Sequence, residues 1–413
     1  MDTVTRRRFL LASGVAAGTA LAAGATTVSV RELVRAGRAD PLDPDSAILV
    51  LVTLYGGNDG LNTVVPAGDT AYQDSRADLA YGQDEVLDLG DGLGLNPSMK
   101  GFKALWDADR LAVVRGVSYP RPDHSHFRSM AIWQSASPQG QVSTGWLGRW
   151  LDATGRDPLR AIAVGSTLPP MLAGAHVAGA ALPLTGIDIG AHRRAQLACL
   201  GRAESGEPDL QGRAAGANKD LLRLADVTGR DASPRPTTSP DDDADDEGGS
   251  GGAREGALAR QLAVVARCIA AGAPTRAYSV SLGGFDTHSN EKRTQSRLLG
   301  ELDEAVAGFL HTVGGGARGA NVVVAVYSEF GRRVAANGSQ GTDHGTAGPM
   351  FVAGTKVKGG FYGEDPSLTD LDDGDLKATT DFRTVYGELV EGVLGTEAGR
   401  VVAGAGDQLG FLR

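Results

Sequence analysis

The sequence predicts an α/β fold in which a mostly parallel central sheet is covered by helices on both faces. Short apolar runs alternate with helical patterns along most of the chain, which is the order that produces parallel sheets. The run "AILVLVTLY" at 47–55 is almost continuously hydrophobic, as is typical of a strand buried on both faces. The chain has 413 residues, 41% of them hydrophobic, and is therefore compatible with one large domain of this class.

The elements follow in a regular order after strand 47–55. The segment "NPSMKGFKALWDADR" indicates a helix with Pro97 in its first turn, where the missing N–H of proline costs no hydrogen bond. "LAVVRGVSY" at 111–119 is the second expected strand, and "HSHFRSMAIWQSA" at 124–136 is the next helix. Later elements, in chain order, are a strand at 160–165, a helix at about 255–271, a strand at 276–282, a helix at about 289–313, strands at 320–328 and 348–354, and a helix at 380–395 that Thr380 or Asp381 would cap.

The N-terminus has the pattern of a twin-arginine export signal. "TRRRFL" at 5–10 is followed by an uncharged stretch as far as Arg31, and "AGA" at 23–25 suits a cleavage site. The stretch is long enough to be a membrane anchor, but its Gly, Ala and Thr content makes it a poor spanning helix. We therefore expect the twin-arginine translocase to export the chain to the periplasm, cell surface or medium, with no stable membrane span after cleavage. The expected divisions are a signal peptide at 1–25, a spacer at 26–44 and a single domain at 45–413.

Charge and composition limit the partners and the irregular regions. The formal net charge of −10 argues against a nucleic acid partner. The segment 231–256 is rich in Pro, Ser, Gly and Asp and nearly free of large apolar residues, so we expect a disordered insertion there. The two cysteines have no ligand-like spacing. Cys268 lies in an apolar helical pattern and is expected to be a small buried residue, although a disulfide with Cys199 is an alternative in an exported protein.

Four polar, glycine-flanked stretches carry the side chains that metal ions bind. Carboxylates and imidazoles that converge from several chain segments form sites for divalent ions such as Zn²⁺, Ca²⁺ or Mn²⁺. Three of the stretches follow expected strands, and ligands of open α/β sheets bind outside the carboxyl ends of the strands. The fourth lies in a glycine-rich loop that leads into strand 348–354. The candidate ligands are Asp59 in "YGGNDGLN", Asp286 and His288 in "GGFDTHSN", Glu329 in "YSEFGR", and Asp343 and His344 in "GTDHGTAGPMF".

Each stretch alone also has a purely structural interpretation. "GGND" is a good turn sequence, because Gly and Asn accept positive φ. Asp286 could cap the helix that follows it, and Glu329 could pair with Arg332. The pair Asp343–His344 could lie in a mobile polar loop. The joint pattern favours a metal site, since four of the seven histidines fall in polar stretches of this kind: His124, His126, His288 and His344.

The segment "RPDHSHFRSM" at 121–130 could carry a nucleophile. Ser125 stands at the expected start of a helix, where free N–H groups and the positive end of the helix dipole favour an anionic group. A metal ion could activate the Ser125 hydroxyl, while His126 and Arg128 bind or protonate the leaving anion. Ser125 could equally be an ordinary N-cap. No G-x-S-x-G sequence occurs in a strand–turn–helix setting, so a Ser-His-Asp hydrolase is not predicted.

Several of these motifs together resemble those of DUF1501, a bacterial family of exported proteins of unknown function. They include "LVTLYGGNDGLNTVVP", "GGFDTHSNE", "VYSEFGRRVAANGSQGTDHG" and "GGFYGEDPSL", and they extend from about residue 47 to 367. The family looks like a member of the alkaline phosphatase/sulfatase-like superfamily. This resemblance implies an alkaline phosphatase-like α/β domain and a metal centre, commonly two zinc ions or one calcium ion.

The resemblance also implies roles for individual residues. Phe330 stands where the superfamily often has a histidine, so one ligand is missing unless Asp343, His124 or His126 replaces it. No sulfatase C/S-x-P-x-R sequence is present either, so a mononuclear or altered site fits better than a two-zinc site. By this likeness Asp59 is the ligand after the first strand, Ser125 falls near the nucleophile position, Asp286 and His288 are the ligand pair of the third motif, Glu329 replaces an Asp-His pair, and His344 is the late histidine ligand.

The expected activity is metal-dependent hydrolysis of a phosphate or sulfate ester, with Ser125 or water as the nucleophile. The substrate would be an anionic ester, either a small molecule or a polysaccharide. A first alternative is a non-catalytic exported binding or assembly protein with a degenerate site. A second is a metal-dependent protein that modifies carbohydrate without a serine nucleophile.

Overall fold

The computed structural model describes residues 26–140, 142–184 and 256–413. The expected signal peptide and nearly all of the expected insertion lie outside the described residues. The expected spacer begins with β1 (Thr26–Thr27), which pairs with β8 (Ala180–Leu182). It continues as α2 (Val30–Ala39), which Ser29 and Glu32 cap reciprocally. Residues 26–39 are therefore part of the folded domain.

The centre of the molecule is β2 (Ile48–Leu54), the apolar run identified in the sequence. All seven residues are buried, and their side chains alternate between two hydrophobic cores. Because successive side chains of a strand point to opposite faces, a strand between two helical layers needs apolar residues at every position. Strands β9 (Ala277–Leu282) and β10 (Val322–Ser328) flank β2 and run parallel to it.

The whole sheet has ten strands and is mostly parallel, which confirms the predicted fold class. Only β13 runs against its neighbours, so the sheet is mixed. Across the sheet the order is β1, β8, β7 (Ala161–Val164), β9, β2, β10, β13 (Gly348–Gly354), β6 (Leu111–Ser118) and β14 (Gly360–Tyr362), with β15 (Thr380–Asp381) also pairing with β6.

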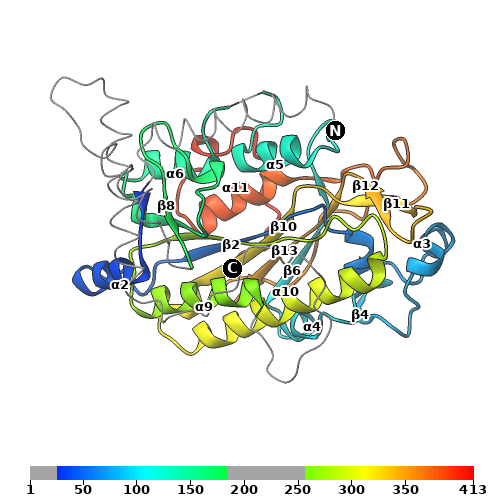
Figure 1. The fold of residues 1–413 in the computed structure, drawn as a ribbon, viewed down its shortest axis with the longest axis horizontal. Helices are drawn as coiled ribbons and strands as arrows, with labels where there is room; N and C mark the ends of the chain where they lie inside the picture. Colours follow the sequence, from blue (N-terminus) through cyan, green and yellow to red (C-terminus); the bar gives the residue numbers. More distant parts are fainter. Residues whose placement is uncertain (1–25, 141, 185–255) are drawn as a thin grey trace, which may run out of the picture.

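Helices cover both faces of the sheet, as predicted (Figure 1). The lower layer in that view contains α4 (Lys100–Asp107), α9 (Ala257–Ala270) and α10 (Glu291–Gly314). Cys268 of α9 is fully buried in this core. The upper layer contains α5 (His126–Ser135), α6 (Trp146–Ala153) and α11 (Phe382–Gly392), the last capped by Asp381.

Two expectations about these elements were wrong. Pro97 precedes α4 instead of lying in its first turn, because the helix begins only at Lys100. The segment containing His344 was expected to be a loop, but it forms β12 (Thr342–His344), which pairs with β11 (Arg332–Ala336).

The remaining elements are α3 (Thr70–Arg76), the sheet of β3 (Val64–Val65), β5 (Leu93–Leu95) and β4 (Leu87–Gly90), and the short 3₁₀ helices Gly60–Asn62, Ala77–Leu79, Pro158–Arg160, Pro170–Leu172, Gly319–Asn321 and Ala398–Arg400.

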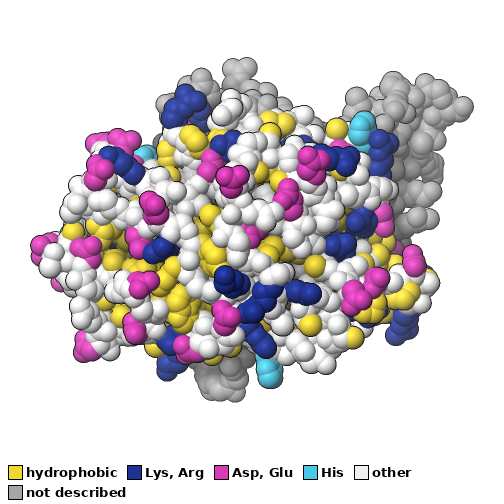
Figure 2. Space-filling model, turned by 180° about the vertical axis from the view of Figure 1, so that it is seen from behind, with side chains coloured by type: hydrophobic (Ala, Val, Ile, Leu, Met, Phe, Trp, Pro, Cys, Tyr) yellow, Lys and Arg dark blue, Asp and Glu magenta, His cyan; other side chains and the backbone are white. Residues whose placement is uncertain are grey.

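None of the helices in the described ranges is both long and apolar enough to cross a membrane. Figure 2 shows the face opposite to that of Figure 1, where acidic and basic side chains both occur, with apolar side chains exposed between them.

Candidate metal centre

The strand topology brings four loops to one edge of the sheet. Strands β2, β9 and β10 are parallel neighbours, so their carboxyl ends lie together. Strand β6 is antiparallel to β13, which is antiparallel to β10, so β6 ends at the same edge and leads into α5. The loops after β2 and β9 touch: a Cβ on Gly56 would lie 2.4 Å from the Asp286 nitrogen, and the φ of Gly56 is +118°. Only glycine permits this approach.

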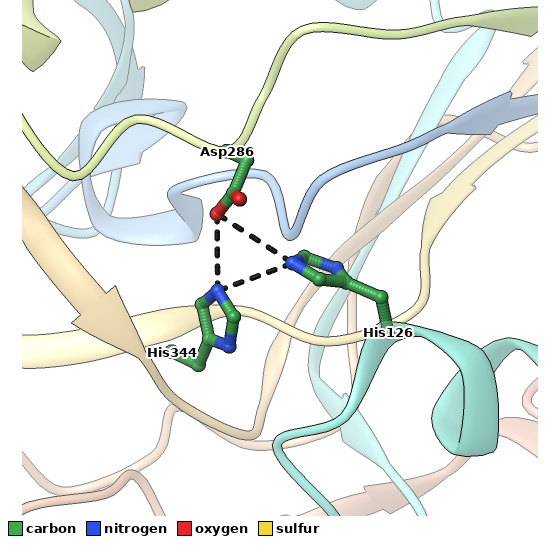
Figure 3. Close-up of side chains that lie close together, drawn as sticks. All are labelled: His126, Asp286 and His344. Atoms are coloured by element: carbon green, nitrogen blue, oxygen red, sulfur yellow. Dashed lines mark hydrogen bonds and ion pairs between the residues drawn. The ribbon is translucent and has the colours of Figure 1, made fainter. Parts of the chain in front are cut away.

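Four side chains from three chain segments converge on the Asp286 oxygen beside this edge. Asp286 and His288 follow β9, His126 is the first residue of α5, and His344 ends β12. The Asp286 Oδ1 lies 3.0 Å from the His344 Nε2, 3.0 Å from the His288 Nε2 and 3.5 Å from the His126 Nε2. The His344 Nε2 is also 3.1 Å from the His126 Nε2 and 3.0 Å from the His288 Nε2. Figure 3 shows His126, Asp286 and His344 pointing toward one another.

A buried carboxylate orients His126. The Glu329 side chain is 1% exposed, and its Oε1 lies 2.8 Å from the His126 Nδ1. Its oxygens also accept hydrogen bonds from the Gly56 N–H and the Ser328 hydroxyl. A carboxylate held by such donors accepts the Nδ1–H of the imidazole, which leaves Nε2 with its lone pair.

Oxygen atoms also face the outer nitrogens of the other two imidazoles. The His344 Nδ1 lies 2.9 Å from the backbone oxygen of His124, which can only accept a hydrogen bond. The imidazole of His124 in turn contacts Asp375, with 2.7 Å between Nε2 and Oδ2. The His288 Nδ1 lies 3.5 Å from Oδ1 of Asp343, a looser contact at an exposed position.

The positions of the ring protons on His126 and His344 decide what the cluster can bind. In the neutral tautomers fixed by Glu329 and the His124 carbonyl, the inner nitrogens of His126 and His344 both carry lone pairs. These lone pairs point toward each other and toward the oxygen of Asp286, and neither imidazole places an N–H group between them. A cation removes this repulsion, and imidazole nitrogens with one carboxylate oxygen are a donor set that suits a divalent transition metal. The residues therefore fit a single metal ion.

The pKa values in the cluster follow from its contacts. Burial disfavours the charged form of Asp286, but the hydrogen bond and the positive charge of Arg332 outweigh burial and hold its pKa at about 2. The hydrogen bond to Glu329 raises the pKa of His126 above its ordinary value, against the effect of burial. Burial lowers the pKa of His344, and the nearby Asp286 carboxylate, which favours the protonated ring, acts in the opposite direction.

Asp59 lies apart from the cluster, in a buried ion pair. Its side chain and that of Arg76 are both fully buried, and the two are hydrogen-bonded. Burial would raise the pKa of Asp59, but the charge of Arg76 outweighs it and lowers that pKa. Glu291, the first residue of α10, lies beside Asp59, and burial together with the Asp59 charge raises its pKa to about 9. In this structure the Asp59 carboxylate is therefore engaged in a buried ion pair and does not face the cluster.

The other candidate residues lie around the cluster. Ser125 is the exposed N-cap residue of α5, and its side chain makes no capping hydrogen bond. Arg128 is exposed, and its Nη1 lies 3.3 Å from the Oδ2 of Asp123. Asp343 contacts the cluster only through His288. The structure thus brings together His126, Asp286, His288 and His344, places Glu329 behind His126, and leaves Asp59 and Arg128 outside the ligand set.

Sequence reasoning anticipated two features of the centre only in part. His126 was expected to act on the leaving group, with replacement of a missing histidine ligand as an alternative, and in the structure its Nε2 joins the candidate ligand atoms. Arg332 was considered only as a partner of Glu329, whereas its guanidinium contacts Asp286 at 2.8 Å. A signal was present for His126, because it stands at the start of a helix that begins at the carboxyl edge of the sheet. No comparable signal existed for Arg332.

One cavity among the described residues is separate from the cluster. Its volume is about 340 Å³, and it lies beside the small β3–β5–β4 sheet. Its lining is largely apolar and includes Leu61, Pro349 and Leu368, with Arg115 and Asp365 at one side. None of the four converging residues lines it.

Comparison with known proteins gives one family. A family model described as "Protein of unknown function (DUF1501)" matches residues 117–384, which is more than half of the chain. This range contains all four converging residues. No curated protein matches the sequence.

Three solved structures have a similar course of the chain at low sequence identity. The lipoteichoic acid synthase LtaP from Listeria monocytogenes is 10% identical, with a TM-score of 0.41 over 93% of this chain and 81% of that one. Ps i-CgsB, solved with k-i-k-neocarrahexaose, is 9% identical, with a TM-score of 0.40 over 87% of this chain and 75% of that one. BT1596, a 2-O GAG sulfatase, is 10% identical, with a TM-score of 0.30 over 76% of this chain and 65% of that one. Similarity at this level carries no information about substrate or reaction.

Proposed function

The chain belongs to DUF1501, a family of proteins of unknown function, and we propose that it is an exported metal-dependent hydrolase of phosphate or sulfate esters. The observation that carries the proposal is the convergence of three imidazole nitrogens on the Asp286 oxygen, at 3.0–3.5 Å. His126, Asp286 and His344 would hold the ion, and His288 would complete the set. Three nitrogen donors and one carboxylate favour Zn²⁺ or Mn²⁺ over Ca²⁺, which prefers an all-oxygen site.

When bound, a divalent cation would polarise an ester oxygen and make a nearby hydroxyl group more acidic. The protein supplies the remaining functions. The first turn of α5 begins at the cluster, so its free N–H groups and dipole favour an anionic ester there. Ser125 is exposed at this helix start, which suits a nucleophile, and Arg128 three residues later is exposed and can reach a phosphate or sulfate.

The test is direct. Purified protein is analysed for metal content and assayed with generic aryl phosphates and aryl sulfates, before and after treatment with a chelator. We expect about one ion per chain and activity that chelation removes. Asp286→Ala should lose both the ion and the activity. Protein without metal, or an Asp286→Ala variant as active as the wild type, would contradict the proposal.

Ser125→Ala separates the two possible nucleophiles. If Ser125 attacks the ester, the variant loses most of its turnover but keeps its metal. If water attacks, or if the protein modifies carbohydrate without a serine nucleophile, the variant stays active. Ser137→Ala, at a partly exposed serine near the opposite end of α5, is the control.

Export is proposed on the sequence alone. The "TRRRFL" segment at 5–10 has the basic and apolar parts of a twin-arginine signal. Replacing Arg6, Arg7 and Arg8 with lysine should retain the full-length protein in the cytoplasm, as measured by cell fractionation. Unchanged export of this variant would argue against the twin-arginine route.

A non-catalytic binding protein is the second candidate, and the burial of Glu329 favours it. This carboxylate is enclosed by the donors of His126, Gly56 and Ser328, so it does not offer a ligand for a second ion. A protein that binds one ion firmly but hydrolyses neither class of ester would support this candidate.

A further inference from the structure

Arg332 is a buried arginine whose guanidinium joins the loops around the metal centre. Its side chain is fully buried, and each of its three nitrogens donates a hydrogen bond to an oxygen. Four of the acceptors are backbone carbonyls and one is a carboxylate. They are Gly57 (from Nε, 2.7 Å), Thr342 (from Nη1, 2.9 Å), and Gly56, Phe285 and Asp286 Oδ1 (from Nη2, the last two at 2.8 Å).

These acceptors belong to three separate segments. Gly56 and Gly57 follow β2, Phe285 and Asp286 follow β9, and Thr342 begins β12. Arg332 itself stands in β11, directly opposite His344 across the hairpin. One side chain therefore connects the segments that present Asp286, His288 and His344.

We propose that Arg332 is a positioning residue that fixes the Asp286 oxygen and the β11–β12 hairpin for metal binding. The inference rests on the proposed metal site. A planar guanidinium can bond to acceptors in several fixed directions, whereas a lysine ammonium is a compact point charge on a flexible stem. The planar, forked shape of the guanidinium, and not only its charge, aligns the three segments.

The charge of Arg332 and its hydrogen bonds change the metal affinity in opposite directions, so variants can test which effect is larger. A positive guanidinium 2.8 Å from a ligand oxygen repels a metal ion bound to that oxygen, so its charge alone weakens binding. Its hydrogen bonds hold Oδ1 beside the imidazoles, which strengthens binding by avoiding the cost of ordering the loops. We infer that the positioning effect is the larger of the two.

The experiment measures Zn²⁺ affinity by calorimetry on chelator-treated protein, comparing wild type with Arg332→Lys and Arg332→Gln. Lysine keeps the charge and loses the fork, whereas glutamine loses both. We expect both variants to bind Zn²⁺ about 10- to 100-fold more weakly, the range found when outer-shell partners of a metal site are removed. Co²⁺ substitution provides a second readout, because its visible absorption spectrum reports how the ligands are arranged.

Arg76→Lys is the matched control. Arg76 is equally buried, pairs with a carboxylate and donates to backbone carbonyls, but contacts none of the four converging residues. We expect this variant to unfold more easily and to keep the Zn²⁺ affinity and Co²⁺ spectrum of the wild type.

Each result decides the question. Wild-type affinity in Arg332→Lys would overturn the inference, because the hydrogen bonds of the guanidinium would then be unnecessary for metal binding. Tighter binding by Arg332→Gln would overturn it as well, because repulsion would then be the larger effect. Failure of both variants to fold would assign Arg332 to the fold itself. If the wild type binds no Zn²⁺, Mn²⁺ or Ca²⁺, the proposed function fails together with the inference.

Discussion

At the residue scale, the centre depends on which oxygen atom faces the outer nitrogen of each imidazole. Glu329 and the His124 carbonyl set the tautomers of His126 and His344, so the inner nitrogens are ready to bind a cation. Asp286 is the shared partner of all three histidines and is held by Arg332. This concentration of contacts on one carboxylate gives the clearest mutational expectation.

Asp286→Asn should weaken metal binding by at least about 100-fold, because it removes the ligand charge while keeping an oxygen for Arg332. Metal affinity is measured by titration of chelator-treated protein. Asp343→Asn is the control: Asp343 lies nearby at an exposed position and, of the four converging residues, contacts His288 alone, with 3.5 Å between Oδ1 and Nδ1. If the two substitutions have equal effects, Asp286 is not the carboxylate ligand.

Glu329→Gln should reduce metal affinity by about 10-fold or more without unfolding the protein, because it weakens the bond that orients His126. Glu388→Gln is the matched control. Glu388 is also a buried glutamate with several donors, but those donors are the backbone N–H groups of Leu409, Gly410 and Leu412. Its substitution should lower stability and leave metal affinity unchanged. A loss of affinity in the control would mean that general destabilisation explains both results.

At the element scale, helices in this fold are stabilised by one another as well as by their own caps. Met99 at the start of α4 offers no capping side chain. Asp303 of α10 replaces it and accepts hydrogen bonds from the N–H groups of Gly101 and Phe102, at 2.7 and 2.6 Å. These N–H groups would otherwise lack an intrahelical partner. The start of α4 is therefore determined by a residue two hundred positions away.

Asp303→Ala should lower the free energy of unfolding by about 1–2 kcal/mol, the usual cost of removing a helix cap. Chemical denaturation followed by circular dichroism measures the change. Glu304→Ala, at an exposed position on the same helix, should change stability by less than about 0.5 kcal/mol. Both variants should bind metal normally. Equal stability of the two variants would show that the contact with α4 contributes nothing measurable.

At the scale of the whole molecule, a buried carboxyl pair links stability to pH. Burial and the neighbouring charge of Asp59 raise the pKa of Glu291 to about 9, whereas a free glutamate has a pKa near 4.5. The folded state therefore holds a proton that the unfolded state releases. This contribution to stability is complete below the pKa of the free side chain and is lost as pH rises through about 9.

We expect the unfolding free energy of the metal-free wild type to fall between pH 6 and pH 9. In Glu291→Gln this fall should be much smaller, because glutamine cannot ionise and can still accept the hydrogen bond from the Thr342 hydroxyl. Denaturation midpoints at several pH values measure both slopes. Identical slopes for wild type and variant would assign the pH dependence to other groups.

Much of the architecture was predictable because it depends on local patterns. The continuous apolar run of β2 predicted a strand buried on both faces, and the alternation of strands with helices predicted the mostly parallel sheet. The same reasoning placed Asp286 and Glu329 at strand ends. It did not find α6, the β11–β12 hairpin or the role of 26–39, because short elements are stabilised mainly by packing against the rest of the chain.

The sequence by itself determined the fold class, the presence of four polar stretches, and Asp286, His288 and His344 as metal-ligand candidates. Only the tertiary structure decided how these residues combine. It moved His126 into the ligand set, placed Glu329 behind it, and enclosed Asp59 with Arg76. The physical reason is that strand patterns arise from neighbours in sequence, whereas the direction of a side chain at a strand end depends on hydrogen bonds from distant segments, as those of Arg332 illustrate.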